Sequence, residues 1–174
     1  MVTSHPTWQH CHTDTPLGQL QLARTEQGLC GAWFVEDQKH SPDPAHFAAE
    51  LHTPSDPLLQ ETCKQLDAYF QRRLQVFDLP LDLDSGTAFQ QSVWRSLQHI
   101  GHGHLSTYAA QAQALNKPTA TRAVGAAVGR NPISIIVPCH RVLGSTGQLT
   151  GYAGGLWRKQ SLLTLEGHDL FSAS

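Results

Sequence analysis

The residues with the clearest chemical potential are Cys139, His140 and Arg141, which directly follow an apolar run and a proline. The run Ile133–Val137 reads ISIIV, which predicts an extended, buried segment. Pro138 ends it and keeps the residue before it out of helical conformation. A thiol beside an imidazole and a guanidinium can act as a nucleophile, because nearby positive charge lowers the thiol pKa from about 8.5 and favours the thiolate.

The alternative is that Cys139 is a buried structural cysteine, which is the commoner fate of an isolated one. Adjacent side chains on an extended chain point apart, so His140 would reach Cys139 through a turn or a water molecule. Cys11, Cys30 and Cys63 lie far apart and form no C-x-x-C pair. They indicate neither a disulfide framework nor a metal site, so we expect no zinc and a reducing, cytoplasmic location.

Length and charge narrow the class of protein that has to position these groups. The chain has 174 residues, is 40% hydrophobic and has a net charge of −2, which suits a globular protein of one or two domains. It contains no apolar run near the ~18 residues of a membrane span, and its polar start shows no secretory signal. Residues 1–84 carry a net −7 and residues 85–174 a net +5. This asymmetry favours nucleic-acid binding by the second part, or simple attraction between the two parts.

The predicted first domain, residues 1–84, is a small α/β unit. Alternation over Gln19–Leu22 and the apolar stretch Leu29–Val35 predict a hairpin of two strands. Apolar residues between Leu59 and Leu74 recur at helical spacing. The alternating segment 77–83 predicts an edge strand, because it contains a proline. The start of the chain is expected to be a frayed terminus, including its histidines His5, His10 and His12.

The predicted second domain, residues 85–174, is mainly helical. Thr87 and Gln90 form a T-x-x-Q capping box at the start of a helix. A short helix over Tyr108–Leu115 is followed by Asn116, which suits a left-handed position. The next helix, Thr119–Val128, is rich in alanine and glycine. Two short helices joined by a tight turn predict a helix-turn-helix, although any helical hairpin gives a similar pattern.

A longer set of motifs surrounds the cysteine. An asparagine stands eight residues before it, and the core P-C-H-R-V is followed by a glycine-rich segment and a helix that ends in Glu-Gly. This string resembles the O6-alkylguanine-DNA alkyltransferases, strongly over residues 87–168 and weakly in the first half. The resemblance implies a ribonuclease-H-like α/β N-terminal domain, with a small antiparallel sheet and a helix, and a winged helix-turn-helix in the C-terminal domain. The residues that carry it are Asn131-Pro132, Pro138–Val142, Gly151–Gly155, Lys159 and Glu166-Gly167.

The resemblance also implies roles for single residues. Cys139 would accept the alkyl group, His140 would take its proton through a water molecule, and Glu166 would orient His140. Asn131 would connect the helix-turn-helix to the cysteine segment. Tyr108 would contact the phosphate 3′ of the target base and donate a proton to the leaving guanine. Without the motif, Glu166 and Tyr108 would read as ordinary helix-end and core residues.

The implied partner is double-stranded DNA with alkylated bases, approached from the minor groove. Arg122 would fill the gap left by the flipped nucleotide, although it could be an ordinary solvated charge. Val142, Tyr152 and Ala153 would line the base pocket, and relatives with serine at the last position make Ala153 a departure. A helix rich in small residues suits a groove roughly 6 Å wide, and base flipping makes the reaction possible.

The implied reaction is single and irreversible: an alkyl group moves from O6-alkylguanine, and from O4-alkylthymine, to Cys139 without a cofactor. We expect a monomer without membrane attachment. The alternative is a non-catalytic lesion-binding protein of the alkyltransferase-like kind, which carries another residue in place of the cysteine. His102 and His104 lack a nearby acid or cysteine and are expected to be solvated loop residues.

Overall fold

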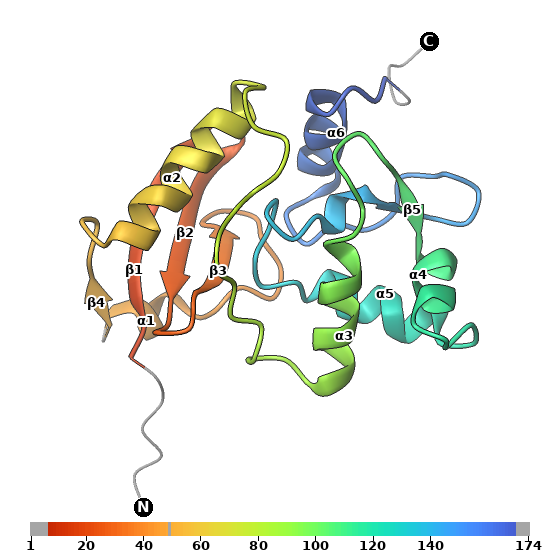
Figure 1. Ribbon diagram of the computed structural model, residues 1–174, viewed down its shortest axis with the longest axis horizontal. Helices are drawn as coiled ribbons and strands as arrows, with labels where there is room; N and C mark the ends of the chain where they lie inside the picture. Colours follow the sequence, from red (N-terminus) through yellow and green to blue (C-terminus); the bar gives the residue numbers. More distant parts are fainter. Residues whose placement is uncertain (1–6, 49, 170–174) are drawn as a thin grey trace, which may run out of the picture.

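The computed structural model describes residues 7–48 and 50–169 and has a sheet half and a helical half side by side (Figure 1). The sheet has the order β3-β2-β1-β4. Its first three strands are antiparallel neighbours, whereas β4 runs parallel to β1. The four strands are β1 (Gln9–Thr15), β2 (Gly18–Arg24), β3 (Leu29–Phe34) and β4 (Leu51–His52).

The helix α2 (Pro57–Phe70) covers one face of this sheet, and the short α1 (Pro44–Ala48) precedes β4 (Figure 1). Asp56 caps α2 by accepting a hydrogen bond from the backbone N–H of Leu59. The predicted helix is present but ends before Leu74, where Arg72 turns into the left-handed region with φ +59°. Leu59 and Leu66 of the predicted stripe are buried, together with Thr62 and Tyr69. The other predicted residues, Cys63, Phe70 and Leu74, are partly buried against the core.

Two predictions for this half are wrong. Segment 77–83 forms no strand; only Leu81 makes an isolated bridge, to Leu29, and Pro80 lacks the N–H that a continuous ladder needs. The start of the chain is not frayed as far as it is described, since His10 and His12 belong to β1 and pair with β2. His5 lies outside the described residues.

The helical half contains α3, the pair α4 and α5, and α6 (Figure 1). The predicted capping box of Thr87 and Gln90 is present at α3, and Thr107 caps α4 through the N–H of Ala110. Asn116 adopts φ +57° after α4, which allows the tight turn into α5. The bounds are α3 (Ala88–Leu97), β5 (Ser106–Thr107), α4 (Tyr108–Ala114), α5 (Thr121–Gly129), β6 (Val142–Leu143) and α6 (Leu156–Leu165), with β5 and β6 forming a parallel pair.

The run Ile133–Val137 is buried as predicted, but it is not a strand. Only Ile133 makes a bridge, to Ala32 of β3, and the chain then turns through Ile135, which has φ +73°. The side chain of Asn131 stabilises this turn, because its amide bonds both the N–H of Ile133 and the carbonyl of Val137. The apolar, β-branched run correctly predicts burial, whereas the extended conformation is wrong because the side chain of Asn131 stabilises a turn.

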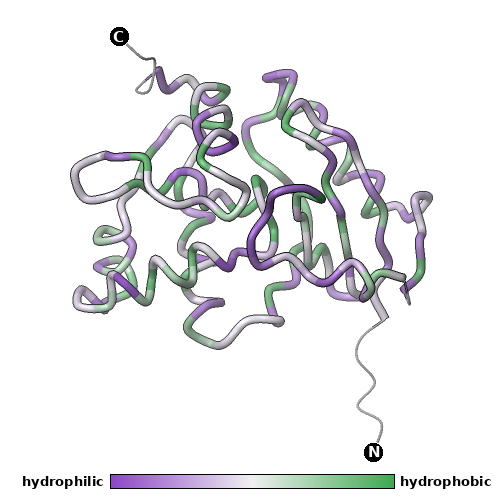
Figure 2. Tube along the Cα trace, turned by 180° about the vertical axis from the view of Figure 1, so that it is seen from behind, coloured by the Kyte–Doolittle hydropathy of each residue, from purple (hydrophilic) through white to green (hydrophobic). Residues whose placement is uncertain are grey.

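One hydrophobic core extends through both halves, so the halves are packed together. It includes Leu22 and Leu66 from the sheet half and Val93, Val137 and Leu162 from the helical half. The hydrophilic loop between β3 and α1 crosses the boundary on the outside, as seen from behind (Figure 2). Among the described residues, no helix is both long and apolar enough to span a membrane.

Candidate functional site

Cys139 starts a short 3-10 turn, Cys139–Arg141, directly after Pro138. Its backbone N–H donates to the carbonyl of Val137 at 2.8 Å, and the residue is only 5% exposed. Asn131 binds the same Val137 carbonyl through Nδ2 at 2.8 Å. Asn131, which follows the last helix of the helix-turn-helix, therefore holds the backbone that leads into Cys139.

His140 is fully buried, and its Nε2 lies 2.8 Å from Oε1 of Glu166. Burial alone would raise the pKa of Glu166, but hydrogen bonds from His140 and Arg141 hold it well below its usual range, so the group is a carboxylate. Nε2 must then carry the proton of that hydrogen bond. This leaves Nδ1 as a buried lone pair without a hydrogen-bond partner in the described chain. Burial also lowers the pKa of His140, which keeps the ring neutral.

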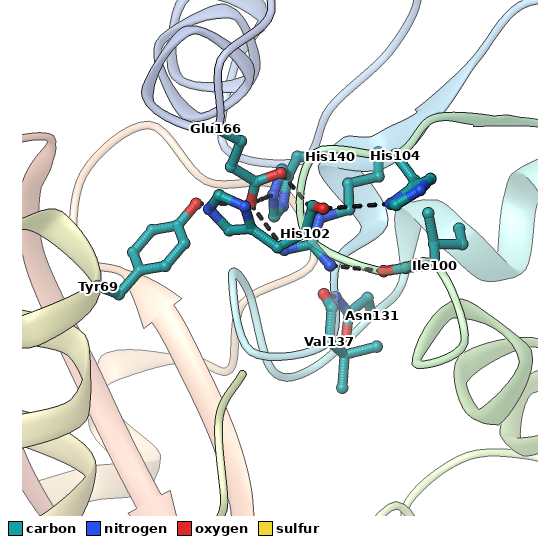
Figure 3. A network of polar contacts seen from close by, with 9 residues as sticks. Tyr69, Ile100, His102, His104, Asn131, Val137, His140 and Glu166 are labelled. Carbon is teal, nitrogen blue, oxygen red and sulfur yellow. Dashed lines mark hydrogen bonds and ion pairs between the residues drawn. The ribbon is translucent and has the colours of Figure 1, made fainter. Parts of the chain in front are cut away.

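Glu166 is the centre of this network (Figure 3). Arg141 donates to it twice, from Nε to Oε2 and from Nη2 to Oε1, each at 2.8 Å. Tyr69, from α2 of the sheet half, donates its hydroxyl to Oε1, also at 2.8 Å. Arg141 further binds the carbonyl of Ile100. The Glu166 carboxylate thus accepts four hydrogen bonds, which hold it in place and fix the orientation of the His140 imidazole.

A buried cation, Lys159, also acts on the thiol. Lys159 is fully buried, and its Nζ donates to the carbonyls of Val142 at 2.6 Å and Thr150 at 2.8 Å. Burial lowers the pKa of Lys159 to about 8, opposed by the charge of Cys139. Burial raises the pKa of the Cys139 thiol, and Asn131 and Lys159 both act in the opposite direction. The site therefore offsets, in part, the cost of forming a thiolate in a buried position.

Cys139 lines a pocket of about 180 Å³ whose walls come from both halves. Tyr108 at the start of α4 and Tyr152 and Ala153 before α6 belong to the helical half, whereas the loop after β3 contributes Lys39 and His40. The backbone N–H of Lys39 donates to the carbonyl of Ala153 at 2.8 Å, which joins the two walls. The pocket can therefore bind a planar group against these aromatic rings and next to the thiol.

The structure brings together most of the predicted site residues. Cys139, Tyr108, Tyr152 and Ala153 line the pocket. Asn131 bonds the carbonyl of Val137, two residues before the cysteine, and His140 is paired with Glu166. Two residues are elsewhere. Val142 does not line the pocket; it is fully buried in β6, where its carbonyl accepts from Lys159. Arg122 lies exposed in the first turn of α5, outside the pocket.

Several contributors were missed from sequence. The sequence motif includes Lys159 but does not show that it is buried; the signal for burial is its apolar neighbours Leu162 and Leu163 on the same helix. Tyr69 falls on the buried side of α2, three residues after Leu66, but its partner is 97 positions away. No sequence signal connects Lys39 with the pocket. Among residues 7–48 and 50–169, no three histidine, cysteine or acidic side chains are arranged to hold a metal ion.

Fold and site together define a class: proteins in which a sheet half supports a helix-turn-helix half that presents a pocketed cysteine with a histidine–carboxylate pair behind it. Residues 11–83 match the family described as 6-O-methylguanine DNA methyltransferase, ribonuclease-like domain, and residues 88–168 match its DNA binding domain. The chain belongs to this family.

Individual relatives agree with this assignment. The chain is 45% identical to a methylated-DNA–protein-cysteine methyltransferase of Methanosarcina barkeri, over 90% of its own length and 96% of the relative's. It is 44% identical to the one of Mycobacterium leprae, over 94% and 96% of the two lengths. The crystal structure of the Mycobacterium tuberculosis O6-methylguanine methyltransferase superimposes with a TM-score of 0.81 at 41% identity, covering 92% of this chain and 93% of that one. A Mycobacterium tuberculosis structure in complex with DNA gives a TM-score of 0.75 at 41% identity, covering 92% of each chain.

Proposed function

We propose that this protein repairs DNA by transferring an alkyl group from a modified base directly to Cys139. The observation that carries this function is the pocket lined by Cys139 and two tyrosines, with the hydrogen-bonded pair of His140 and Glu166 next to the cysteine in the chain. The family and the names of the relatives support the same activity, a methylated-DNA–protein-cysteine methyltransferase. DNA is the macromolecular partner, in agreement with the DNA binding domain match and the DNA complex of a relative.

The proposed step is a displacement at the alkyl carbon. The thiol of Cys139 gives its proton to Nδ1 of His140 through a water molecule, and the resulting imidazolium is stabilised by the carboxylate of Glu166. The thiolate sulfur then forms a bond to the alkyl carbon while the bond from that carbon to O6 breaks. The leaving guanine carries the electron pair and receives a proton from Tyr108, whose side chain lies on the pocket wall. The thioether product contains no good leaving group, so each molecule reacts once.

The target base has to leave the duplex, because the pocket is enclosed by protein on several sides. We propose that α5 enters the minor groove and that Arg122 replaces the flipped nucleotide in the stack. Its exposed position in the first turn of α5 and the small residues Gly125 and Gly129 support this arrangement. Tyr152 and Ala153 would contact the base, whereas Val142 would act from behind the pocket.

The scope of the proposal follows from the same features. O6-alkylguanine and O4-alkylthymine are the proposed substrates, without a cofactor. A monomer is proposed, because one chain supplies every residue of the pocket and of the network behind it. The four free cysteines support a reducing, cytoplasmic location. The domain boundary is proposed between residues 84 and 85, before the capping box of α3.

Intact-mass spectrometry tests the function most directly. After incubation with duplex DNA that contains O6-methylguanine, we expect one methyl group per molecule, on Cys139, in a burst equal to the protein concentration. Continued product formation beyond one equivalent would mean that the protein is a true catalyst and would overturn the acceptor mechanism. The lesion-binding alternative, which expects no mass change, is not favoured, because Cys139 is present and the relatives are named methyltransferases.

Arg122→Ala tests the DNA arrangement. We expect repair of duplex DNA to slow by about 10- to 100-fold, since flipping costs a few kcal/mol, while transfer from the free base O6-benzylguanine stays unchanged. Measuring both substrates with the same variant separates the two steps. Arg95→Ala, an exposed residue of α3, is the matched control. Equal losses on both substrates would show that Arg122 has a structural role instead.

A further inference from the structure

Tyr69 connects the sheet half to the site behind the cysteine. It lies one residue before the end of α2 and is 1% exposed. Its hydroxyl donates to Oε1 of Glu166 at 2.8 Å, in a fully internal position (Figure 3). The ring is held by aromatic neighbours, with centroids 5.2 Å from Phe70, 5.3 Å from Phe77 and 6.4 Å from His102. The packing of the ring therefore fixes the position of the hydroxyl.

The oxygen that Tyr69 binds is the one that His140 uses. Oε1 of Glu166 accepts from Tyr69, from Nε2 of His140 and from Nη2 of Arg141, all at 2.8 Å. An oxygen shared by three donors distributes its negative charge among them. The strength of the His140–Glu166 bond, and with it the basicity of the imidazole, thus depends on how much of that charge the other two donors withdraw.

We propose that Tyr69 is a positioning residue for alkyl transfer, through which the sheet half holds Glu166 toward His140 and sets the basicity of that histidine. This inference rests on the proposed function. The reacting atoms do not touch Tyr69, because Glu166 and His140 stand between it and the thiol. Phenylalanine would pack equally well among these rings, so the hydroxyl itself is the feature that needs an explanation.

Tyr69→Phe removes the donor and keeps the ring. Oε1 then concentrates its charge on His140 and Arg141, so the imidazolium is favoured and His140 stays protonated to higher pH. The neutral ring is the form that accepts the thiol proton. The midpoint of the pH–rate profile should therefore lie about one pH unit higher than in the unchanged protein. One hydrogen bond to a charged group is worth about this much. The other ionisable or charged groups facing this set are Cys139, Arg141, Tyr152, Lys159 and His102, so the midpoint belongs to the coupled set.

The experiment measures the single-turnover rate of transfer from O6-benzylguanine between pH 5 and 9. For Tyr69→Phe we expect a loss of about tenfold below the midpoint and rates equal to the unchanged protein well above it. Phe77→Leu is the control, since it loosens the packing around the same ring and does not touch Glu166. For Phe77→Leu we expect a rate that is reduced equally at every pH. The proposal would be overturned if Tyr69→Phe gave the same result, or if its midpoint did not move.

A second substitution covers the case in which Tyr69→Phe does not fold. Site-specific 3-fluorotyrosine at position 69 keeps the ring and hydroxyl but makes the phenol a stronger donor, so the midpoint should move to lower pH. An unmoved or raised midpoint would contradict the proposal. The proposed function fails separately: if the unchanged protein gains no alkyl group at Cys139, the function is wrong, whereas normal transfer with unmoved midpoints in both variants rejects only the role of Tyr69.

Discussion

Cys30 in the sheet half and Cys139 in the helical half are equally buried, each at 5% exposure, and yet the charge that acts most strongly on each thiol has the opposite sign. Burial raises the pKa of Cys30 to about 12, and the nearby charge of Asp82 acts in the same direction, with Arg24 and a backbone hydrogen bond as smaller opposing effects. Burial also raises the pKa of Cys139, but the amide of Asn131 and the ammonium group of Lys159 act against it. Burial alone therefore does not distinguish a structural thiol from a reactive one; the charge and hydrogen bonds around it do.

The backbone adds a second difference. Cys30 lies within β3, in a small apolar cluster with Ala23 and Trp33. Cys139 starts a turn and faces a pocket. Cys30 packs among side chains of a strand that pairs with β2, whereas a cysteine at the start of a turn can face open space. The two halves thus use the same residue type for packing and for chemistry.

The largest expected effect comes from exchanging the two thiols for hydroxyls. Cys139→Ser should abolish transfer and leave binding to duplex DNA intact, whereas Cys30→Ser should still gain one methyl group per molecule. Intact mass after reaction with O6-methylguanine DNA measures both, with a filter-binding assay for DNA affinity. Methyl transfer to the Cys139→Ser variant would show that Cys139 is not the acceptor.

The next effect concerns the carboxylate of Glu166, which pairs with His140 beside Cys139. Glu166→Gln should slow transfer by about 10²- to 10⁴-fold, because the imidazole loses its charged partner. The folded pKa of Glu166 is depressed, so its contribution to stability is present above the unfolded value of about 4.3 and is lost as pH falls through the folded value. Denaturant unfolding from pH 7 to pH 3 should therefore show a steeper loss for the unchanged protein than for Glu166→Gln. Parallel curves would contradict this assignment.

A smaller change tests the buried cation. Lys159→Met should slow transfer by about tenfold and move the reaction of Cys139 with iodoacetamide to higher pH, since a positive charge near the thiol is removed. It also deletes the hydrogen bonds to Val142 and Thr150. Lys117→Met, at an exposed lysine, serves as the control. An unchanged iodoacetamide profile would mean that Lys159 supports only the loop.

The smallest effect should appear at Cys30 itself. Asp82→Asn removes the neighbouring negative charge and should lower the pKa of Cys30 below about 12. Burial remains, so its labelling by iodoacetamide at pH 8 should rise by less than about tenfold. Peptide mapping after labelling gives the rate. If Cys30 then reacted as fast as Cys139, burial would matter less than we infer.

Sequence reasoning found the acceptor and its immediate partners because they are close along the chain. Cys139, His140 and Asn131 lie within ten residues, and their spacing is a main part of the motif that identifies the family. The helices of the second half also follow from local signals, such as the Thr87 capping box at α3 and the left-handed Asn116 after α4. Local hydrogen-bonding chemistry determines these features, so the sequence expresses them directly.

The parts that could not be predicted depend on contacts over long distances. Segment 77–83 alternates like a strand, but it runs between the two halves, where the carbonyl of Pro80 accepts from Leu29. Ile133–Val137 has strand-forming residues, but the amide of Asn131 bends it. The bonds of Tyr69 to Glu166 and of Lys39 to Ala153 join residues more than 90 positions apart. Neither periodicity nor composition contains this information.

The bond between Lys39 and Ala153 has a consequence for how such a protein can evolve. It joins two backbone groups, so the side chains at positions 39, 40 and 153 can change without opening the wall they form. The acceptor and its proton relay lie on other elements and need not change with them. Single substitutions along this wall can therefore alter which adducts are accommodated while the chemistry is inherited intact, which makes substrate range the part of this protein that is freest to diverge between lineages.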